Sequence, residues 1–227
     1  MTSTRIEGRK HHQALKVMGF PERVALFVAA IHRPRAEELL SGFSNGPQER
    51  ASAFAEDMKQ WDSARRQARL ARQVCARVIV TLRVGDLLRM QALAGLDLTV
   101  LPVPDAAEGM AASIRSGAAA AQGALMILPG DMPELDAEDL AVMIGAFDQR
   151  PDAILRGTSA DGRPGHPVIF PADLRGALQD LRGDAGARSL LILHQARVRL
   201  IALPDQHALT DLDTPEAWAA WHARRQG

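Results

Sequence analysis

The sequence predicts an α/β protein, a single domain in which helices cover both faces of a mostly parallel sheet. Two observations predict this class. Short, continuous apolar runs rich in Val, Ile and Leu alternate along the chain with longer amphipathic segments, a pattern typical of buried strands that alternate with helices. The 227 residues also suffice for one domain with a substantial core, and no repeat or low-complexity linker divides them.

Seven apolar runs are the expected strands, at residues 24–30, 76–82, 98–103, 124–129, 152–156, 166–170 and 198–203. Because they are continuous rather than alternating, each is expected to be buried on both faces. Helices are expected between them, over residues 47–74, 85–94 and 109–121 and from residues 137 and 215 onward, and residues 183–188 are expected to open a further one. Asp136 is a suitable N-cap, and Thr214 followed by Pro215 is a strong helix start. The alternation predicts three α/β/α layers around a Rossmann-like sheet.

Composition excludes several classes of protein. Lys+Arg and Asp+Glu both number 27, so the net charge is zero and no electrostatic excess favours nucleic acid. The single cysteine cannot form an internal disulfide, which suits a reducing cytoplasm. No apolar run approaches the ~20 residues that cross a bilayer, and the first residues lack the apolar centre of a signal peptide. We therefore expect a cytoplasmic protein without a membrane or nucleic-acid partner.

Residues 1–20 are expected to be peripheral to the fold. The stretch Ile6–Arg9 reads IEGR, which resembles a protease-cleavage site, and two histidines follow it. The same residues could equally be native. The domain itself is expected over residues 21–227.

Acidic residues follow two of the apolar segments. Asp131 comes directly after residues 124–130, in a stiff turn bounded by prolines. Ligands of open α/β sheets bind beyond the carboxyl ends of the strands, so this carboxylate is a candidate site residue, although a turn or capping role is the alternative. Asp211 and Asp213 flank Leu212 and share one side of an extended segment. For Asp213 the alternative is stabilisation of the following helix dipole.

Three further candidate segments for ligand binding are centred on glycines, at residues 108–113, 162–167 and 183–188. The first follows a strand and opens a helix, where backbone N–H groups suit a phosphate or another polar ligand group. The second precedes a strand, and the third opens another helix. Taken singly, each is an ordinary loop and supports no function.

Together and in this order, five segments resemble the MobA-like nucleotidyltransferases, most closely the molybdenum-cofactor cytidylyltransferase branch. They are EGMAASIRSG at 108–117, LMILPGDMPEL at 125–135, GRPGHPVIF at 162–170, RGDAGARSLL at 182–191 and DLDTPEAW at 211–218. They extend over roughly the last two-thirds of the chain, and five ordered motifs are far more specific than one. The resemblance implies the fold of the nucleotide-diphospho-sugar transferases.

The resemblance also implies a reaction. Members transfer a nucleoside monophosphate from a nucleoside triphosphate, here CTP by preference, to a small phosphorylated acceptor such as molybdopterin, and release pyrophosphate. Asp131 and Asp213 would be the catalytic carboxylates that hold Mg²⁺, a hard ion that prefers carboxylate and phosphate oxygens. Catalysis would rest on positioning and electrostatics, without a protein nucleophile. A molybdoenzyme or its chaperone is the implied protein partner.

By the same resemblance, other residues would contact the two substrates. Gly109 and Ser113 would lie along the nucleotide. His166, Asp184 and Arg188 would face the acceptor.

The first strand departs from the family pattern. Ala29 and Ala30 match the start of the nucleotide-binding turn, but Ile31 stands where members have glycine, and the lysine that follows in members is missing. A β-branched residue cannot adopt the positive φ of glycine without strain. Arg33 and Arg35 supply basic groups nearby and are candidate catalytic contacts to the triphosphate. The alternative is that both merely solvate a surface loop.

Two further functions remain open from the sequence. One keeps the fold and changes the chemistry, namely a nucleotide-sugar glycosyltransferase whose metal site uses Asp211 and Asp213. The other is a catalytically inactive relative that binds a molybdenum cofactor, which the altered first turn would explain.

Overall fold

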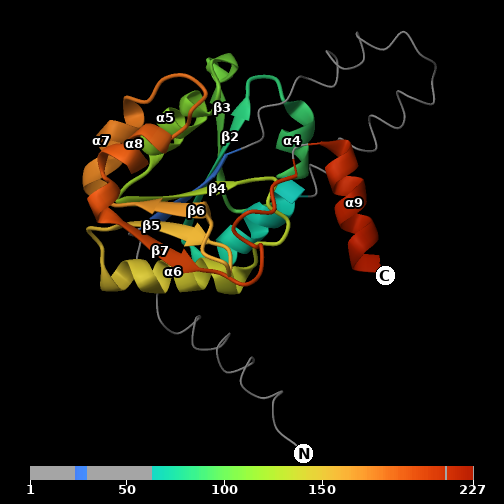
Figure 1. The fold of residues 1–227 in the computed structure, drawn as a ribbon. Coiled ribbons are helices and arrows are strands. Elements are labelled where there is room, and N and C mark those ends of the chain that lie inside the picture. The colour runs from blue at the N-terminus through green and yellow to red at the C-terminus, as the bar shows by residue number, and fades with distance from the viewer. Residues whose placement is uncertain (1–23, 30–62, 213, 227) are drawn as a thin grey trace, which may run out of the picture.

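A seven-stranded sheet forms the centre of the computed structural model, which describes residues 24–29, 63–212 and 214–226 (Figure 1). The strand order is β3-β2-β1-β4-β6-β5-β7. The strands are β1 (Val24–Ala29), β2 (Arg77–Arg83), β3 (Thr99–Val103), β4 (Ala124–Pro129), β5 (Ile154–Thr158), β6 (Pro164–Phe170) and β7 (Val198–Ala202). Each of the seven predicted runs therefore forms a strand.

The sheet is mostly parallel, as the alternation of strands and helices predicts. Strand β1 pairs in parallel with both β2 and β4, and the pairs β2–β3 and β5–β7 are also parallel. Strand β6 is the exception, because it runs antiparallel to both β4 and β5. This reversal brings the start of β6 to the carboxyl ends of its two neighbours, where ligands of α/β sheets bind.

Two strands differ from the prediction of burial on both faces. β3 and β7 lie at the edges of the sheet, and most of their residues are half-buried or exposed. Their apolar runs resemble those of central strands, but an edge strand has one neighbour and incomplete cover from helices. The expectation is wrong for these two strands.

Where the limits lie in the described residues, the helices begin and end close to the predicted ones; the start of the helix predicted over residues 47–74 lies outside the described residues. They comprise a helix over residues 63–74, α4 (Leu87–Ala92), α5 (Met110–Ala120), α6 (Ala137–Gln149), α7 (Arg175–Gln179), α8 (Arg188–Leu193) and α9 (Pro215–Gln226). Asp136 caps α6, accepting hydrogen bonds from the backbone N–H groups of Glu138 and Asp139, while the Asp139 side chain accepts from the Asp136 N–H. This reciprocal capping box fixes where α6 begins. The short helix α7 had no signal in the sequence.

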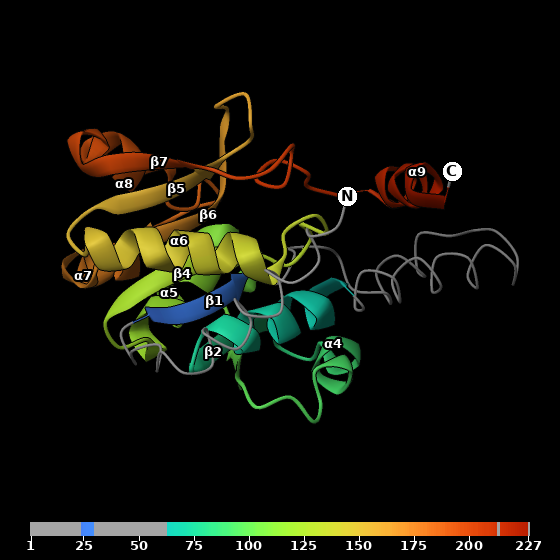
Figure 2. The same cartoon turned by 90° about the horizontal axis from the view of Figure 1, so that it is seen from below.

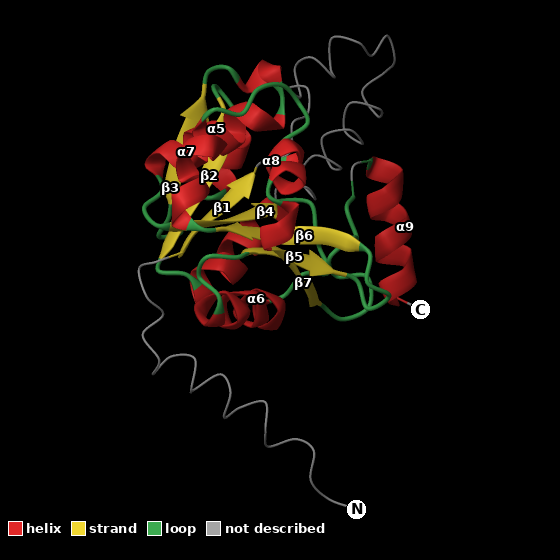
Figure 3. Cartoon of the chain, turned by 60° about the vertical axis from the view of Figure 1, so that its left-hand side comes forward, coloured by secondary structure: helices red, strands yellow, loops and turns green. Residues whose placement is uncertain are grey.

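Helices cover both faces of the sheet (Figure 3), and an apolar cluster packs on each face. One joins the helix over residues 63–74 and α6 to side chains such as Val80, Met126 and Ile169. The other joins α5, α7 and α8 to side chains such as Ile127, Val168 and Phe170. Because neighbouring residues of a strand point to opposite faces, the continuous apolar runs supply both clusters. The three predicted layers are confirmed.

The last helix, α9, is set apart from the sheet (Figure 2). Trp218 and Trp221 on this helix are nonetheless buried, in a small cluster with Leu212. The indole N–H of Trp218 donates to the carbonyl of Leu212 at 2.9 Å, and that of Trp221 donates to the Glu134 carboxylate at 3.1 Å. These contacts tie α9 to the segment before it and to the turn after β4.

Several predicted features lie outside the described residues. They are the peripheral segment 1–20 and the candidate site residues Ala30, Arg33, Arg35 and Asp213. In the described part of the chain, no helix is long and apolar enough to cross a membrane.

Candidate active site

Asp131 lies in the turn that follows β4, at the carboxyl end of the strand, and its side chain is buried. The helix over residues 63–74 holds this turn on both sides of Asp131. The Ser63 hydroxyl donates to the carbonyl of Gly130 at 2.9 Å, and the Gln67 amide donates to the carbonyl of Met132. The position of this carboxylate is therefore set by backbone contacts on either side of it.

The segment before α9 reaches the same turn. The backbone N–H of Leu212 donates to the carbonyl of Asp131 at 3.2 Å. Leu212 is buried against Trp218, which fixes the segment in this place. Residue 213 lies outside the described residues, but the residue directly before it is thus in contact with Asp131. Two parts of the chain that are about eighty residues apart meet at the carboxyl end of β4.

The start of β6 adjoins this meeting point. Ile127 of β4 pairs with Val168 of β6, and because the two strands are antiparallel the residues before Val168, among them His166, extend toward the carboxyl end of β4. The N–H of His166 donates to the carbonyl of Ala208 at 2.9 Å. At Gly165, a Cβ atom would stand 1.9 Å from the same carbonyl oxygen, so only glycine allows this approach. Residues 205–212 therefore run from the start of β6 to the turn at Asp131.

The beginning of α5 and the loop before α8 pack against each other. Gly109 adopts a φ of 108°, and a Cβ atom there would stand 2.7 Å from the Cα of Asp184. The N–H of Ala111 donates to the carbonyl of Gly183 at 3.2 Å. Ser113 is buried one turn further along α5. Two segments that the resemblance assigned to different substrates are thus one packed unit.

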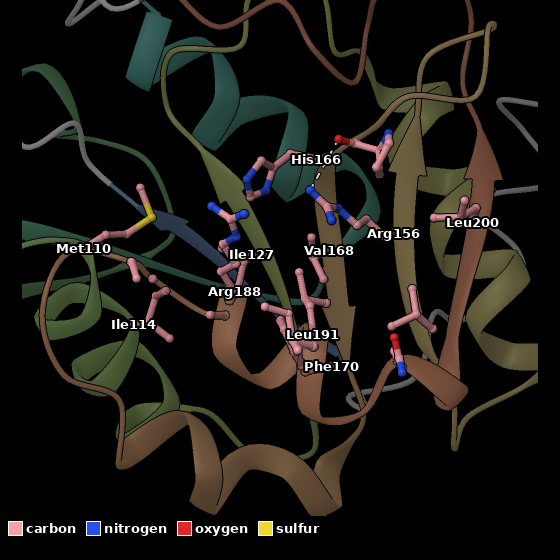
Figure 4. A pocket seen from close by; sticks show the side chains of 17 residues that line it. Met110, Ile114, Ile127, Arg156, His166, Val168, Phe170, Arg188, Leu191 and Leu200 are labelled. Atoms are coloured by element: carbon pink, nitrogen blue, oxygen red, sulfur yellow. Dashed lines mark hydrogen bonds between the residues drawn. The ribbon is translucent and has the colours of Figure 1, made fainter.

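A cavity of about 730 Å³, here named the β6–α8 cavity, lies between the sheet and α8 (Figure 4). Its walls are formed mostly by apolar side chains from β4, β6, β7, α5 and α8, namely Met110, Ile114, Ile127, Val168, Phe170, Leu191, Ile192, Val198 and Leu200. His166, Arg156 and Arg188 also line it, and none of the seventeen lining residues is acidic. The cavity is a large, mainly apolar pocket with a few basic groups, which is the usual composition of a small-molecule site.

The basic groups of the cavity lie close to one another (Figure 4). The Arg156 guanidinium donates to the carbonyls of Gly165 and Pro164, at 3.1 and 3.3 Å. Burial lowers the pKa of Arg156, and the positive charge of Arg188 lowers it further. Burial also lowers the pKa of His166 to about 4, with the charge of Arg156 acting in the same direction and the Ile127 carbonyl against it. At neutral pH the imidazole is therefore uncharged.

A second group of polar residues joins the segment 205–212 to the start of α6. Ligand atoms of Asp136, Asp139 and His207 lie within 4.8 Å of one another, so the three could hold a metal ion. The same atoms already have local partners, because the two carboxylates form the capping box of α6 and His207 Nδ1 lies 2.8 Å from Asp139. Burial raises the pKa of Asp139, while hydrogen bonds from the Asp136 backbone and His207 oppose the rise.

Some of the predicted site residues come together in this structure. Asp131 and His166 lie at the carboxyl end of β4, and Ala29 pairs with Pro129 at the end of β1. Gly109 and Ser113 lie at the start of α5, and Arg188 lines the cavity. Asp184 is exposed and does not line it; its backbone packs against Gly109 instead.

Sequence reasoning missed Arg156 and His207. Arg156 was visible as the one basic residue of the expected strand 152–156, at its end. Its position in the wall of the cavity depends on a sheet order that places β5 beside β6, which the sequence does not show. His207 lies in a loop without a motif, and nothing in the sequence linked it to α6.

Comparison with known families settles the kind of protein. Residues 62–198 match the family described as the MobA-like NTP transferase domain, over more than half of the chain. The chain belongs to this family. As a MobA-like protein it is a nucleotidyltransferase, and both the resemblance and the enzyme class expected from the sequence are confirmed.

Solved structures share the fold of this MobA-like protein. A homolog of Mycobacterium tuberculosis Rv0371c from Mycobacterium sp. strain JC1 is 23% identical, with a TM-score of 0.66 over 91% of this chain and 99% of the other. The M. tuberculosis H37Rv protein in complex with manganese is 24% identical, with a TM-score of 0.62 over 87% and 96% of the two chains. A CMP-2-keto-3-deoxy-manno-octonic acid synthetase in complex with CTP is 10% identical, with a TM-score of 0.60 over 90% and 98%. A comparison with curated proteins found no match.

Proposed function

We propose that this protein transfers a nucleoside monophosphate, CMP by preference, from its triphosphate to the phosphate of a small acceptor such as molybdopterin. An oxygen of the acceptor phosphate attacks the α-phosphorus of the triphosphate. A new P–O bond forms, the bond from the α-phosphorus to the bridging oxygen breaks, and pyrophosphate leaves. The observation that carries the proposal is the contact of the Leu212 N–H with the carbonyl of Asp131, at the carboxyl end of β4.

A divalent cation, with Mg²⁺ expected, suits the residues at the carboxyl end of β4. Asp131 supplies hard carboxylate oxygens there, and the contact through Leu212 brings the residue before Asp213 to the same turn. These two carboxylates would hold the ion, and a related fold was crystallised with manganese. When bound, such an ion neutralises negative charge on the phosphates. The buried turn around Asp131 keeps the carboxylate in place between turnovers.

Other residues of this chain have supporting roles in the proposal. Ala29 and Ala30 with Gly109 and Ser113 would lie along the nucleotide, and Arg33 and Arg35 would bind its triphosphate. His166 and Arg188 would face the acceptor, with Asp184 supporting their loop. CTP is the favoured donor because the sequence resembles the cytidylyltransferase branch and a protein of similar fold was crystallised with CTP. The single cysteine suits a protein of the reducing cytoplasm, where the reaction would take place. A molybdoenzyme or its chaperone would receive the product.

Pyrophosphate release tests the proposal. The full chain is assayed with CTP, GTP, ATP and UTP, with Mg²⁺ or Mn²⁺, in the presence of reduced molybdopterin. We expect release with CTP that depends on both the acceptor and the cation. A folded protein that releases pyrophosphate with none of the four triphosphates would overturn the proposal, and hydrolysis of a sugar nucleotide instead would favour the glycosyltransferase.

A matched pair of variants assigns the activity to the site. Asp131→Asn removes the charge of the buried carboxylate, and we expect roughly a 100-fold or greater loss of turnover, because several kcal/mol of charge stabilisation depend on the cation. Asp148→Asn makes the same change at an exposed position near the end of α6 and should leave turnover unchanged. Equal activity of the two variants would exclude Asp131 from the reaction.

A further inference from the structure

The Glu134 carboxylate connects the turn at Asp131 with the last part of the chain. Glu134 lies three residues after Asp131, in the same turn after β4. Its Oε2 atom accepts from the Thr210 hydroxyl at 2.5 Å, and its Oε1 atom accepts from the indole N–H of Trp221 at 3.1 Å. The two donors come from either side of Asp213 in the sequence, one before it and one after it.

These two contacts bring α9 to the turn, although the helix stands clear of the strands (Figure 1). The two buried tryptophans of α9 form a small cluster with Leu212, separate from the large apolar clusters on the sheet. The Leu212 N–H reaches the Asp131 carbonyl at 3.2 Å, which is a bond between neutral groups. The bonds to Glu134 have a charged acceptor, and such bonds are about twice as strong as neutral ones.

The contacts of Glu134 are those of a residue that orients other ligands. Each of its oxygens accepts from a donor of the same chain, and among the described residues no salt bridge joins Glu134 to a basic side chain. Residues that fix metal ligands through hydrogen bonds, without touching the ion, strongly affect metal affinity when they are removed.

We propose that Glu134 is a positioning residue, which holds residues 210–221 against the turn at Asp131 so that Asp213 reaches the cation held by Asp131. This rests on the proposed function, in which these two carboxylates hold the ion. Loss of the Glu134 contacts therefore lowers cation affinity, although Glu134 does not touch the ion. The helix α9 takes part in the site through Trp221.

Binding of Mn²⁺ to the full chain, without triphosphate or acceptor, tests the effect on the cation. The EPR signal of the free ion measures it. Glu134→Ala removes both acceptor oxygens, and we expect its Mn²⁺ affinity to be at least about tenfold lower than that of the wild type. The control is Glu138→Ala, an exposed change in the first turn of α6, which should bind Mn²⁺ like the wild type. Wild-type affinity in Glu134→Ala would refute the role of Glu134.

Glu134→Gln distinguishes positioning from direct contact with the ion. The amide carbonyl can still accept from Trp221, and the amide NH₂ can donate to the Thr210 hydroxyl. That hydroxyl can in turn donate to the Gln206 carbonyl, which lies 3.2 Å away. We therefore expect Glu134→Gln to keep most of the wild-type affinity for Mn²⁺. A loss as large as that in Asp131→Asn would contradict the positioning role and make Glu134 a ligand.

Amide hydrogen exchange tests the anchoring without any cation. The Leu212 N–H is protected by its bond to the Asp131 carbonyl, and local opening of residues 210–221 would expose it. Its exchange should be at least about tenfold faster in Glu134→Ala than in Glu138→Ala. Equal rates in the two variants would overturn the anchoring.

Two substitutions of the donors keep the test decisive if Glu134→Ala does not fold. Thr210→Val removes the hydroxyl and Trp221→Phe removes the indole N–H, while Glu134 stays in place. The double variant should show weakened Mn²⁺ binding and faster exchange of the Leu212 N–H. Wild-type values for both measurements would refute the proposal.

The positioning role and the proposed function fail in different ways. Mn²⁺ binding that is lost in Asp131→Asn and unchanged in Glu134→Ala would contradict the role of Glu134 and support the cation site. Mn²⁺ binding that is unchanged in Asp131→Asn, together with faster Leu212 exchange in Glu134→Ala, would contradict the cation site and support the anchoring.

Discussion

The turn at Asp131 and the β6–α8 cavity are built in different ways. The turn is held by backbone carbonyls, which accept hydrogen bonds from Ser63, Gln67 and Leu212. The cavity is formed by side chains of strands that are distant in sequence, and its arginines have no carboxylate partner within the described residues. Backbone contacts thus fix the turn, whereas side chains from several strands and helices give the cavity its shape.

This difference separates the two tasks of the proposed reaction. A carboxylate that holds a cation has to stay in one place, and backbone contacts fix it whatever the substrate is. An acceptor pocket has to match one molecule, and side chains on a rigid sheet can change that match without disturbing the fold. The variants below break either the connection between the regions or one region alone.

Gly165→Ala should have the largest effect, because it separates the two regions. The new Cβ would stand 1.9 Å from the carbonyl oxygen of Ala208, so β6 and residues 205–212 must move apart. We expect a loss of at least about 3 kcal/mol in the free energy of unfolding. Urea unfolding measures it, with Gly176→Ala in α7 as the control, where a Cβ meets no atom within 4 Å. Equal stability of the two variants would mean that Gly165 and Ala208 are not in contact.

His166, a residue of the cavity and not of the turn, should make the free energy of unfolding depend on pH. Its pKa is about 4 in the folded state and near 6.5 when unfolded, so the unfolded chain binds more protons between these values. The free energy of unfolding should therefore fall as the pH drops from about 6.5 to 4, by on the order of 2 to 3 kcal/mol.

The comparison that isolates this effect is wild type against His166→Gln across the same pH range. The pKa of Asp139 is raised by burial, so this residue changes the free energy of unfolding with pH in the direction opposite to His166. The change is the same in both proteins and cancels in their difference. Parallel curves for the two proteins would show that His166 titrates normally when folded.

Gly109→Ala should disturb the unit formed by α5 and the loop before α8. The residue has a φ of 108°, and a Cβ would stand 2.7 Å from the Asp184 Cα. Strain of this kind costs about 2 kcal/mol. Thermal unfolding measures the loss, and Gly145→Ala, in open space on α6, is the control. A Gly109→Ala protein as stable as the control would contradict the close approach to Asp184.

Asp136→Ala should have the smallest effect and should leave both regions intact. It removes the side chain that caps α6 and accepts two backbone N–H groups, which costs about 1 kcal/mol. Glu138→Gln, an exposed change in the first turn of the same helix, is the control for altered charge. If the group with Asp139 and His207 holds a cation needed for turnover, Asp136→Ala also abolishes pyrophosphate release, and the metal assignment to Asp131 fails.

Patterns within short stretches of sequence predicted the strands and most of the helices. Apolar runs gave all seven strands, because burial on a sheet demands them, and the start of α6 was predicted from the capping properties of Asp136. The short helix α7 was missed because five residues carry no periodic signal. The partial exposure of β3 and β7 was missed because an apolar run does not show which strands lie at an edge.

Within the candidate site, the residues found in advance were those in motifs at the ends of strands, such as Asp131 and His166. Arg156 was missed because it lies inside a strand, and its surroundings depend on the antiparallel insertion of β6 between β4 and β5. No local pattern encodes that order of strands.

The sequence alone determined the alternation of strands and helices, the family and the placement of acidic residues after strands, because each depends on neighbouring residues or on an ordered set of motifs. The tertiary structure decided that β6 runs against its neighbours, that residues 205–212 join its start to the turn at Asp131, and that two arginines share one cavity. These contacts connect residues that are distant along the chain, and they follow from how the apolar faces pack together rather than from any local preference.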